Sequence, residues 1–512
     1  MLITRRLLLG AVGTLPLARL VRGATAHRLT ILHVNDFHSR HEPVDPRAMT
    51  CTADKIGGEK GGCFGGSPRL ATAIREQRRA AEADGRTVVL LDGGDQFQGS
   101  LFYNANHGMA ELAVQHAVGT DAMAVGNHEF DNGPGVLARY VAAAAFPVLS
   151  ANVDAADDPD LRGLLHPYTI LRRGGLRLGV VGLTTREALV TSSPGPHVDI
   201  TDPRPALLAA IAACRAEGVD AIIVLSHLGL PSDVALRVPG VALVVGGHTH
   251  TLLSNTEPGA QGPDPTPGTD ATPIVQAGAY GRYLGRVDLD LAEDGTVLAL
   301  AAACRHVGLD LVPDPAVAAI VARFAAPIAA LRARRVTTLA TALDVGACRV
   351  AQCRFGTIAA EAMRAAVHGA SVGLMNAGGL RVGLPPGPLS YGQVLEAMPF
   401  GNTLASLTLT GADLAAAAMH GLSMVGRGGF PQWAGLRARG LPPGLEVEHP
   451  DGTWAPLDRT ALYLVATNNF VRNGGDGYIV LRDRAIDPYD TGPSVAELVA
   501  AALENGAAQR EP

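Results

Sequence analysis

Short apolar runs that each end in glycine, acidic, amide or histidine residues constrain the fold of this chain more than any other feature. Five such runs occupy residues 29–34, 87–91, 122–125, 221–225 and 241–245. Stretches with helical patterns alternate with short apolar runs along this part of the chain, a rhythm typical of layered α/β packing. In open α/β sheets, sites form at the carboxyl ends of the strands. The sequence therefore predicts an α/β domain whose polar strand ends meet at one edge.

The polar residues after these runs suit two divalent cations. They read Asn35-Asp36-Phe37-His38, Asp92-Gly93-Gly94-Asp95, Gly126-Asn127-His128-Glu129-Phe130-Asp131, Ser226-His227 and Gly246-Gly247-His248-Thr249-His250. Imidazole and carboxylate together accommodate Zn, Mn, Fe or Co, and one carboxylate can bridge two ions. Asp95 is the candidate bridge. Glycines before Asp95, Asn127 and His248 would let a metal or phosphate approach the backbone.

His128 and Asp131 form a second chemical unit beside these residues. His128 adjoins Asn127 on an expected irregular turn and can serve the leaving oxygen of a phosphate ester. Asp131, three residues on, can hold the tautomer of that imidazole. The alternative for His128 is a structural histidine.

Length and composition limit the class of protein. At about 150 residues per domain, 512 residues predict two to four domains. Hydrophobic residues make up 47% and charged residues 18%, which excludes a largely disordered chain. The net charge is -6, and it falls to about -10 without the four arginines of residues 1–26. A duplex nucleic acid partner is therefore not expected. The oligomeric state stays open.

The first 26 residues predict an export signal. Thr4-Arg5-Arg6 forms a basic start, residues 7–17 are apolar, and Ala24-Thr25-Ala26 fits signal processing. The adjacent arginines resemble a twin-arginine signal, although a Sec signal can also carry them. No other run reaches the roughly 18 apolar residues of a membrane helix. We therefore expect a periplasmic or secreted protein without an integral membrane span.

The rest of the chain divides into successive regions. We predict a catalytic α/β domain over residues 27–310, a linker helix within 311–340, a second domain over 341–505 and a tail over 506–512. Residues 255–273 have the composition of a surface insertion. Ser67 and Pro68 are expected as the N-cap and first residue of a helix, and Gly85 as its left-handed end.

The cysteines suggest local loops. Cys51 with Cys63, and Cys348 with Cys353, could close such loops in an oxidising compartment, while Cys214 is expected as a buried thiol. Six cysteines allow 15 connectivities, so the pairing stays open on these grounds.

The motifs DFH, GGDQFQG, GNHEFDNG, SHLG and GGHTH, in this order, resemble those of calcineurin-like metallophosphoesterases, and specifically the 5'-nucleotidase and UDP-sugar hydrolase family. The resemblance covers nearly the whole mature chain. It implies a four-layer sandwich of two mixed sheets flanked by helices, followed by an α+β substrate-binding domain. It also implies two sets of metal ligands that share Asp95. The first set is Asp36, His38, Asp95 and His250. The second set is Asp95, Asn127, His227 and His248. His128 would then stabilise the transferring phosphoryl group, and Asp131 would orient His128.

Glycine loops of the second domain carry arginines and aromatic residues. Arginine suits an anionic phosphate, and an aromatic side chain beside glycine suits stacking on a planar ring. The family resemblance makes Phe400 and Phe470 a base sandwich and Asp476 an acceptor for ribose hydroxyls. It makes Arg349, Asn376 and Arg381 contacts to phosphate or ribose, and the spacing of Cys348 and Cys353 resembles a disulfide loop of some members. The substrate would bind between the domains, with the helix near 314–335 as a hinge.

These inferences together predict an exported, metal-dependent 5'-nucleotidase. It would release phosphate from nucleoside 5'-monophosphates by attack of a metal-bound water or hydroxide, using two ions of Zn, Mn or Co. UDP-sugars or other nucleotide anhydrides are further candidate substrates. The alternatives are a 2',3'-cyclic-nucleotide phosphodiesterase with 3'-nucleotidase activity, a thiosulfohydrolase of sulfur oxidation, and a non-catalytic nucleotide-binding protein.

Overall fold

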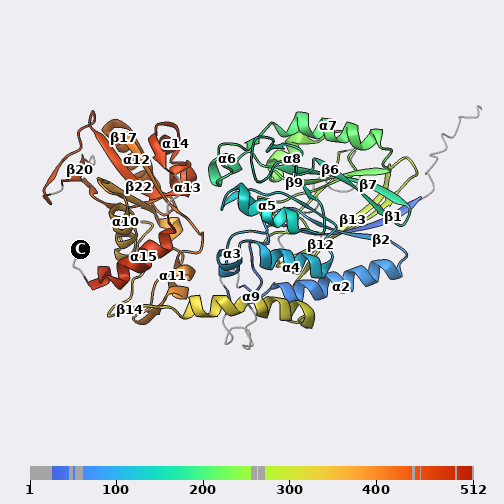
Figure 1. Ribbon diagram of the computed structural model, residues 1–512, viewed down its shortest axis with the longest axis horizontal. Helices are drawn as coiled ribbons and strands as arrows, with labels where there is room; N and C mark the ends of the chain where they lie inside the picture. Colours follow the sequence, from blue (N-terminus) through green and yellow to red (C-terminus); the bar gives the residue numbers. More distant parts are fainter. Residues whose placement is uncertain are drawn as a thin grey trace, which may run out of the picture.

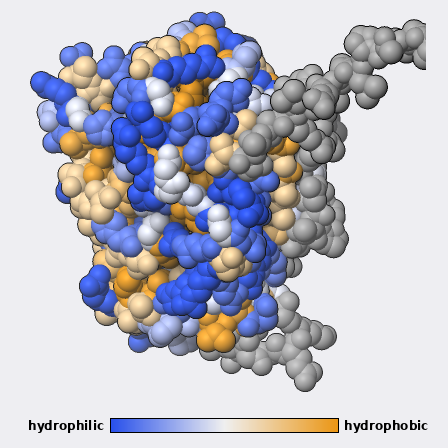
Figure 2. Space-filling view, turned by 90° about the vertical axis from the view of Figure 1, so that its right-hand side faces the viewer, coloured by the Kyte–Doolittle hydropathy of each residue, from blue (hydrophilic) through white to orange (hydrophobic). Residues whose placement is uncertain are grey.

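The computed structural model describes residues 26–44, 50–51, 62–254, 262, 271–440, 444–449, 451–489 and 493–509. Two domains lie side by side, and α9 (Pro315–Ala333) runs below the first domain and reaches the second at one end (Figure 1). The predicted export segment lies outside the described residues except for Ala26, and most of the predicted insertion at 255–273 also lies outside them. The end of the first domain farthest from the second is mainly hydrophilic, with scattered hydrophobic residues (Figure 2).

Two mixed sheets form the centre of the first domain. The six strands of the first sheet, in spatial order, are β13 (Val297–His306), β12 (Tyr283–Leu291), β1 (His27–Val34), β2 (Thr87–Asp92), β3 (Ala122–Ala124) and β4 (Val148–Leu149). The five strands of the second are β11 (Ile274–Val275), β10 (Leu243–Val245), β9 (Ala221–His227), β7 (Leu176–Thr184) and β6 (Tyr168–Arg173). Strands β1 to β4 are parallel, as are β7, β9, β10 and β11. The carboxyl ends of both parallel sets can therefore face one edge.

The apolar side chains of the strands alternate between an inner and an outer core. Ile31 and Val89 of the first sheet share an inner core with Val180 and Ile223 of the second. Outward-facing residues pack instead under the flanking helices. These helices are α2 (Ser67–Ala83), α3 (Leu101–Asn106), α4 (Met109–Val118), α5 (Pro134–Ala143), α6 (Ala188–Thr191), α7 (Pro203–Ala216) and α8 (Leu230–Leu236). This arrangement is the four-layer α/β sandwich that the family resemblance implied, with a small ladder of β5 (Val153–Asp154) and β8 (Asp199–Ile200) beside it.

The start of α2 differs from the sequence prediction. Gly66 is the N-cap, and Ser67 is the first helical residue without a capping hydrogen bond. The buried Ser67 hydroxyl lies 2.7 Å from Nδ1 of His41 instead. This tertiary contact outweighs the local preference of serine for the cap position. Gly85 adopts the predicted left-handed conformation after the helix, with φ of 70°.

The linker α9 joins the two domains and packs against α2, α3 and α4 of the first domain and α11 (Tyr391–Ala397) of the second. The sequence predicted no membrane span. By length and composition, however, α9 is long and apolar enough to cross a membrane, and no other helix within the described ranges is. Length and composition alone do not establish a span, so the expectation stays a prediction.

The second domain is an α+β unit, as expected. Its main sheet contains β18 (Pro431–Ala434), β15 (Val372–Asn376), β22 (Leu462–Asn468), β17 (Leu404–Thr410) and β23 (Ile486–Tyr489). Two helices, α10 (Arg354–Ala366) and α12 (Gly411–Ser423), contribute to separate cores on this sheet. Further helices are α13 (Asn469–Arg472), α14 (Ile479–Asp483) and α15 (Val495–Glu504). One small sheet pairs β14 (Arg335–Leu339) with β16 (Gly387–Ser390). Another contains β19 (Leu436–Arg439), β20 (Gly444–Glu448) and β21 (Trp454–Pro456).

Both suggested cysteine pairs are disulfides. Cys51 bonds Cys63, and Cys348 bonds Cys353. Cys214 is a buried free thiol, which confirms that prediction, and Cys304 is a second one. Each disulfide closes a short loop within one domain and does not tie the domains together.

One close approach inside the first sheet can be tested. His33 of β1 is directly opposite Gly285 of β12, and a Cβ atom on Gly285 would lie 2.0 Å from the His33 ring. Burial holds the pKa of His33 down at about 4, so this ring is packed and neutral. We expect Gly285→Ala to lower the free energy of unfolding by about 1–3 kcal/mol through overpacking. Gly444→Ala, at an open strand position, is the control for urea denaturation, and equal stability of both variants would contradict this packing.

Candidate metal centre and substrate cleft

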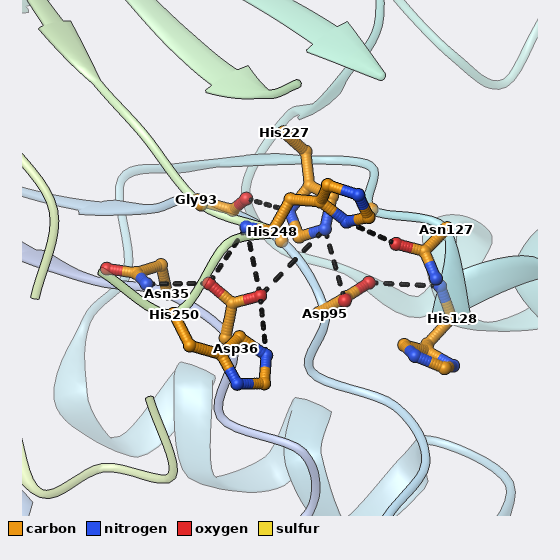
Figure 3. A network of polar contacts seen from close by, with 12 residues as sticks. Asn35, Asp36, Gly93, Asp95, Asn127, His128, His227, His248 and His250 are labelled. Carbon is orange, nitrogen blue, oxygen red and sulfur yellow. Dashed lines mark hydrogen bonds and ion pairs between the residues drawn. The ribbon is translucent and has the colours of Figure 1, made fainter. Parts of the chain in front are cut away.

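Loops from both sheets of the first domain bring the predicted metal ligands together (Figure 3). Asp36 and His38 follow β1, Asp95 follows β2, and Asn127 follows β3. His227 ends β9, and the last two predicted ligands, His248 and His250, follow β10. Three groups of these side chains, one of which includes His128, have candidate ligand atoms within 4.8 Å of one another. The strand ends that the sequence singled out therefore converge.

Asp36 organises one half of this cluster. The amide of Asn35 donates to Asp36 Oδ2 at 2.6 Å, and the backbone N–H of His248 donates to both carboxylate oxygens at 3.0 Å. His250 Nε2 lies 3.4 Å from Asp36 Oδ1 and 3.0 Å from His38 Nε2. Two imidazole nitrogens and a carboxylate thus face one small space.

Asp95 lies between the two halves of the cluster. Its Oδ2 atom is 3.1 Å from His227 Nε2 and 3.9 Å from His38 Nε2. Its Oδ1 atom accepts the backbone N–H of His128 at 2.9 Å. This central position supports the choice of Asp95 as the carboxylate shared by two cations.

The outer nitrogens of three histidines are held by oxygen atoms. His227 Nδ1 lies 2.6 Å from the carbonyl of Gly93, and His38 Nδ1 lies 3.3 Å from the carbonyl of Phe97. His248 Nε2 is 2.9 Å from Glu187, while its Nδ1 faces the Asn127 side-chain oxygen at 3.0 Å. A histidine whose outer nitrogen is held this way presents the other nitrogen to a metal. Sequence reasoning missed Glu187, which lies far along the chain from His248.

The backbone around the cluster is strained. Five of the seven predicted ligands have positive φ, with values of 50°, 51°, 57°, 73° and 54° at Asp36, His38, Asp95, His248 and His250. Such conformations persist in non-glycine residues where the surrounding structure over-determines them. The predicted role of glycine before the ligands also has a geometric basis, because a Cβ on Gly126 would lie 2.2 Å from Asp95 Oδ1.

Glu129 ties two of the ligand loops together, and the sequence analysis gave it no role. Its buried carboxylate accepts N–H groups from Asp95 at 3.0 Å, Gln96 at 2.8 Å, Phe97 at 3.2 Å and Gly126 at 2.7 Å. Each carboxylate oxygen accepts two of these bonds. Glu129 therefore fixes the loop after β2 against the loop after β3.

Charges of opposite sign balance across the cluster. Burial opposes ionisation of Asp95, but His227 and His128 hold the pKa of Asp95 well below its usual range. Burial likewise lowers the pKa of His128, yet Asp131 and Asp95 outweigh it and raise that pKa to about 10. His38, by contrast, has its pKa lowered to about 3, chiefly by burial. His128 Nδ1 lies 2.7 Å from Asp131 Oδ2, so the predicted orienting pair is in contact.

A cavity of about 840 Å³ lies between the domains, with the candidate metal centre on one wall. His128 and Asp131 line the same wall as five of the predicted metal ligands, and Asp36 and His227 are buried behind it. All six predicted substrate-binding residues also line the cavity, namely Arg349, Asn376, Arg381, Phe400, Phe470 and Asp476. Residues that sequence reasoning missed line it too, among them Arg40, Gln98, Tyr280, Asn402 and Asn469.

The second-domain wall is organised by its own contacts. Asn376 donates to Asp476 Oδ2 at 2.7 Å, and the Arg381 guanidinium carbon lies 5.5 Å from the centre of the Phe400 ring. Phe400 is 42% exposed, which leaves its ring accessible. Gln98 of the first domain donates a hydrogen bond to the carbonyl of Phe400, so the two walls touch.

Comparison with known proteins places the chain in a family. Residues 29–252 match the family described as calcineurin-like phosphoesterase, and residues 329–483 match that described as 5'-nucleotidase, C-terminal domain. A 5'-nucleotidase of Diplobatis ommata is 32% identical over 94% of this chain and 88% of its own length. The chain belongs to the 5'-nucleotidase family.

Solved structures agree with this assignment. The 5'-nucleotidase precursor from Thermus thermophilus has a TM-score of 0.72 and 34% identity, covering 93% of this chain and 96% of its own. The sulfate thiohydrolase SoxB of Thermus thermophilus has a TM-score of 0.64 and 24% identity over 93% and 94% of the two chains. At that identity, the likeness to SoxB shows a shared fold alone.

Calcineurin-like phosphoesterases use divalent metal ions, and the residues of this chain fit such ions. Carboxylate, amide and imidazole groups suit Zn, Mn and Co. The three histidines with restrained outer nitrogens point the remaining nitrogen toward Asp95, His250 or Asn127. The candidate clusters thus have both the ligand chemistry and the supporting contacts of a metal centre.

The anchoring role of Glu129 can be tested by Glu129→Gln. The amide nitrogen would face two backbone N–H donors that now share a carboxylate oxygen, leaving both without an acceptor. We expect the free energy of unfolding to fall by about 2–5 kcal/mol. Urea denaturation measures it, with exposed Glu82→Gln as the control. A change below about 0.5 kcal/mol, typical of surface substitutions, would contradict the role.

Proposed function

We propose that this protein is an exported, metal-dependent 5'-nucleotidase that converts nucleoside 5'-monophosphates to nucleosides and phosphate. UDP-sugars and other nucleotide anhydrides are further candidate substrates. The observation that carries the proposal is the shared cavity, in which candidate metal ligands face arginines and phenylalanines of the second domain. A phosphate ester with a planar base would use both walls at once.

The proposed metal ligands form two sets that share Asp95. Asp36, His38, Asp95 and His250 would hold one cation, and Asp95, Asn127, His227 and His248 would hold the other. When bound, two divalent cations neutralise phosphoryl oxygens and activate water at neutral pH. We propose Zn, Mn or Co for these positions.

His128 and Asp131 would act on the phosphoryl group without ligating a metal. Asp131 contacts Nδ1 of His128 at 2.7 Å and thereby orients the ring. The other ring nitrogen can then donate a proton or a hydrogen bond to an oxygen of the ester. Because His128 lines the cavity, this nitrogen can meet a bound substrate.

The second domain would select the nucleotide. Phe400 and Phe470 would stack on the base, and Asp476, oriented by Asn376, would accept ribose hydroxyls. Arg349 and Arg381 would hold phosphate or ribose oxygens. α9 would act as the hinge that lets the two walls part and close.

The other candidate activities have weaker support. The relative from Diplobatis ommata and the Thermus precursor, both 5'-nucleotidases, are 32% and 34% identical to this chain, whereas SoxB is 24% identical. A 2',3'-cyclic-nucleotide phosphodiesterase remains the second candidate within the same fold. A non-catalytic nucleotide-binding role is disfavoured by the paired His128 and Asp131 beside the ligand set.

A substrate panel tests the proposed function. Metal-stripped protein is resupplied with Mn, Co, Zn or Mg and assayed for phosphate release from AMP, UMP, UDP-glucose, ATP, 2',3'-cyclic AMP and 3'-AMP. Release from AMP and UMP after metal addition is the expected result. Activity confined to the cyclic nucleotide and 3'-AMP would favour the second candidate.

Removing the shared carboxylate should remove metal. Asp95→Asn keeps the size of the side chain but loses its charge, and we expect metal affinity to fall roughly 100-fold or more. Phosphate release from AMP should fall with it. Elemental analysis after equilibration with Mn measures the first effect, and exposed Asp84→Asn is the control. Full metal content in Asp95→Asn would contradict the assignment.

A substitution of Phe470 can distinguish recognition of the base from hydrolysis of the phosphate ester. Phe470→Ala should raise KM for AMP by about 5- to 150-fold, the equivalent of about 1–3 kcal/mol per stacked base. Ribose 5-phosphate has no base, so its kcat/KM should stay close to the wild-type value. Steady-state kinetics on both substrates measure the difference. Equal losses on the two substrates would count against stacking.

A further inference from the structure

Arg40 is a cation in the cavity between the domains that has no ion-pair partner within the described ranges. Two residues after His38, it lines the cavity on the first-domain wall. Among the residues that the structure describes, its guanidinium forms no ion pair and no hydrogen bond, and its Nε atom is buried. Burying a charged group without compensation is costly, and truly unpaired examples point to a role outside the fold.

The surroundings of Arg40 place it beside the candidate metal centre. Its guanidinium carbon lies 5.6 Å from the centre of the Tyr280 ring. The same ring lies 5.5 Å from the His38 ring and 5.3 Å from the His250 ring. Arg282 approaches Tyr280 at 5.2 Å and is not part of the cavity lining. Two guanidinium groups therefore contact the Tyr280 ring, and of these two arginines Arg40 lines the cavity.

Among the described residues, no carboxylate forms an ion pair with Arg40. A guanidinium group keeps its charge at neutral pH. An anion that enters the cavity would supply the missing partner.

The loop that carries Arg40 is held on both sides. Ser39 donates a hydrogen bond to the buried Glu111 carboxylate of α4, and His41 Nε2 lies 3.2 Å from the same carboxylate. His41 Nδ1 also contacts Ser67 of α2 at 2.7 Å. The neighbours of Arg40 are thus fixed by buried hydrogen bonds, while its own guanidinium has no hydrogen bond or ion pair in the part of the chain that the structure describes. This is the arrangement expected of a preorganised binding residue.

We propose that Arg40 binds oxygens of the phosphoryl group that is hydrolysed, and so is a catalytic residue supplied by the first domain. This inference rests on the proposed function and adds a contact that the base-recognising residues do not provide. Because it acts on the phosphoryl group alone, it should serve every phosphate monoester equally, whatever base the ester carries.

The test compares substrates that differ only in the base. Arg40→Met keeps the aliphatic stem and removes the charge. With the Mn-loaded full chain, we expect kcat/KM to fall roughly 10- to 100-fold, and by the same factor, on AMP and on ribose 5-phosphate. The inhibition constant of inorganic phosphate should rise by a similar factor, while that of adenosine should not change. Arg40→Lys should recover part of the loss.

Arg282→Met is the matched control, because Arg282 contacts the same ring without lining the cavity. It should keep the wild-type inhibition constant for inorganic phosphate. A loss in Arg40→Met that affects AMP but not ribose 5-phosphate would overturn the proposal in favour of a base or ribose contact. An unchanged inhibition constant for phosphate would overturn it as well.

Thermal unfolding separates a binding role from a structural one. Removing an uncompensated buried charge should leave the Tm of Arg40→Met equal to or above that of the wild type. Added inorganic phosphate should raise the Tm of the Mn-loaded wild type and raise that of Arg40→Met less. A lower Tm without phosphate would show that Arg40 supports the fold and would overturn the proposal. This readout needs no turnover, so it can fail or succeed independently of the proposed nucleotidase activity.

Discussion

The bonds from four backbone N–H groups to the Glu129 carboxylate are the constraint on which the candidate active site depends. They join the loop after β2 to the loop after β3, and these loops carry Asp95 and Asn127. Asp95 has a left-handed backbone conformation that asparagine, aspartate and glycine tolerate best. A fixed acceptor for its N–H group helps to hold that conformation. The Glu129 carboxylate thereby helps to position the central Asp95 side chain.

The rest of the site follows from the way the two sheets pack. Their inner faces share one apolar core, so the parallel strands of both end near the same rim. Asp36 accepts the backbone N–H of His248 across that rim, which links the first sheet to the second. The candidate metal centre therefore also links the two sheets. Strain at five ligands is offset by the buried core beneath them.

The sequence was most informative where a polar side chain directly follows a predicted strand. Asp36, Asp95 and His227 follow or end apolar runs, and this local pattern was enough to predict that they lie at one edge of the sheets. Glu129 and Arg40 lay inside or beside the same motifs, but their roles depend on which distant groups approach them. The role of Glu129 depends on the loop after β2, and the role of Arg40 depends on its place in the cavity between the domains. These contacts join residues that are distant in the sequence, so the spacing of residues along the chain could not predict them.

Other differences have the same origin. Ser67 has the local chemistry of an N-cap, yet its hydroxyl is committed to His41. The contact of Gln98 with Phe400 also joins residues from different domains, so the sequence offered no sign of it. Local patterns predicted the strands and the polar side chains that meet at their ends, whereas the partners of individual side chains required the assembled fold. The placement of Glu187 next to His248 is a further example.

The proposed division of roles between the domains explains why an arginine with no ion pair among the described residues can persist in the first domain. The second domain contributes Phe400 and Phe470, whose rings can recognise a base, but a base carries no charge to pair with Arg40. The phosphoryl group is the part of a nucleotide that carries charge to the first-domain wall. A partner built into the protein, such as a carboxylate beside Arg40, would stabilise the free protein and compete with that group. Because no carboxylate of the described residues pairs with this guanidinium, its best interaction is with the substrate that we propose.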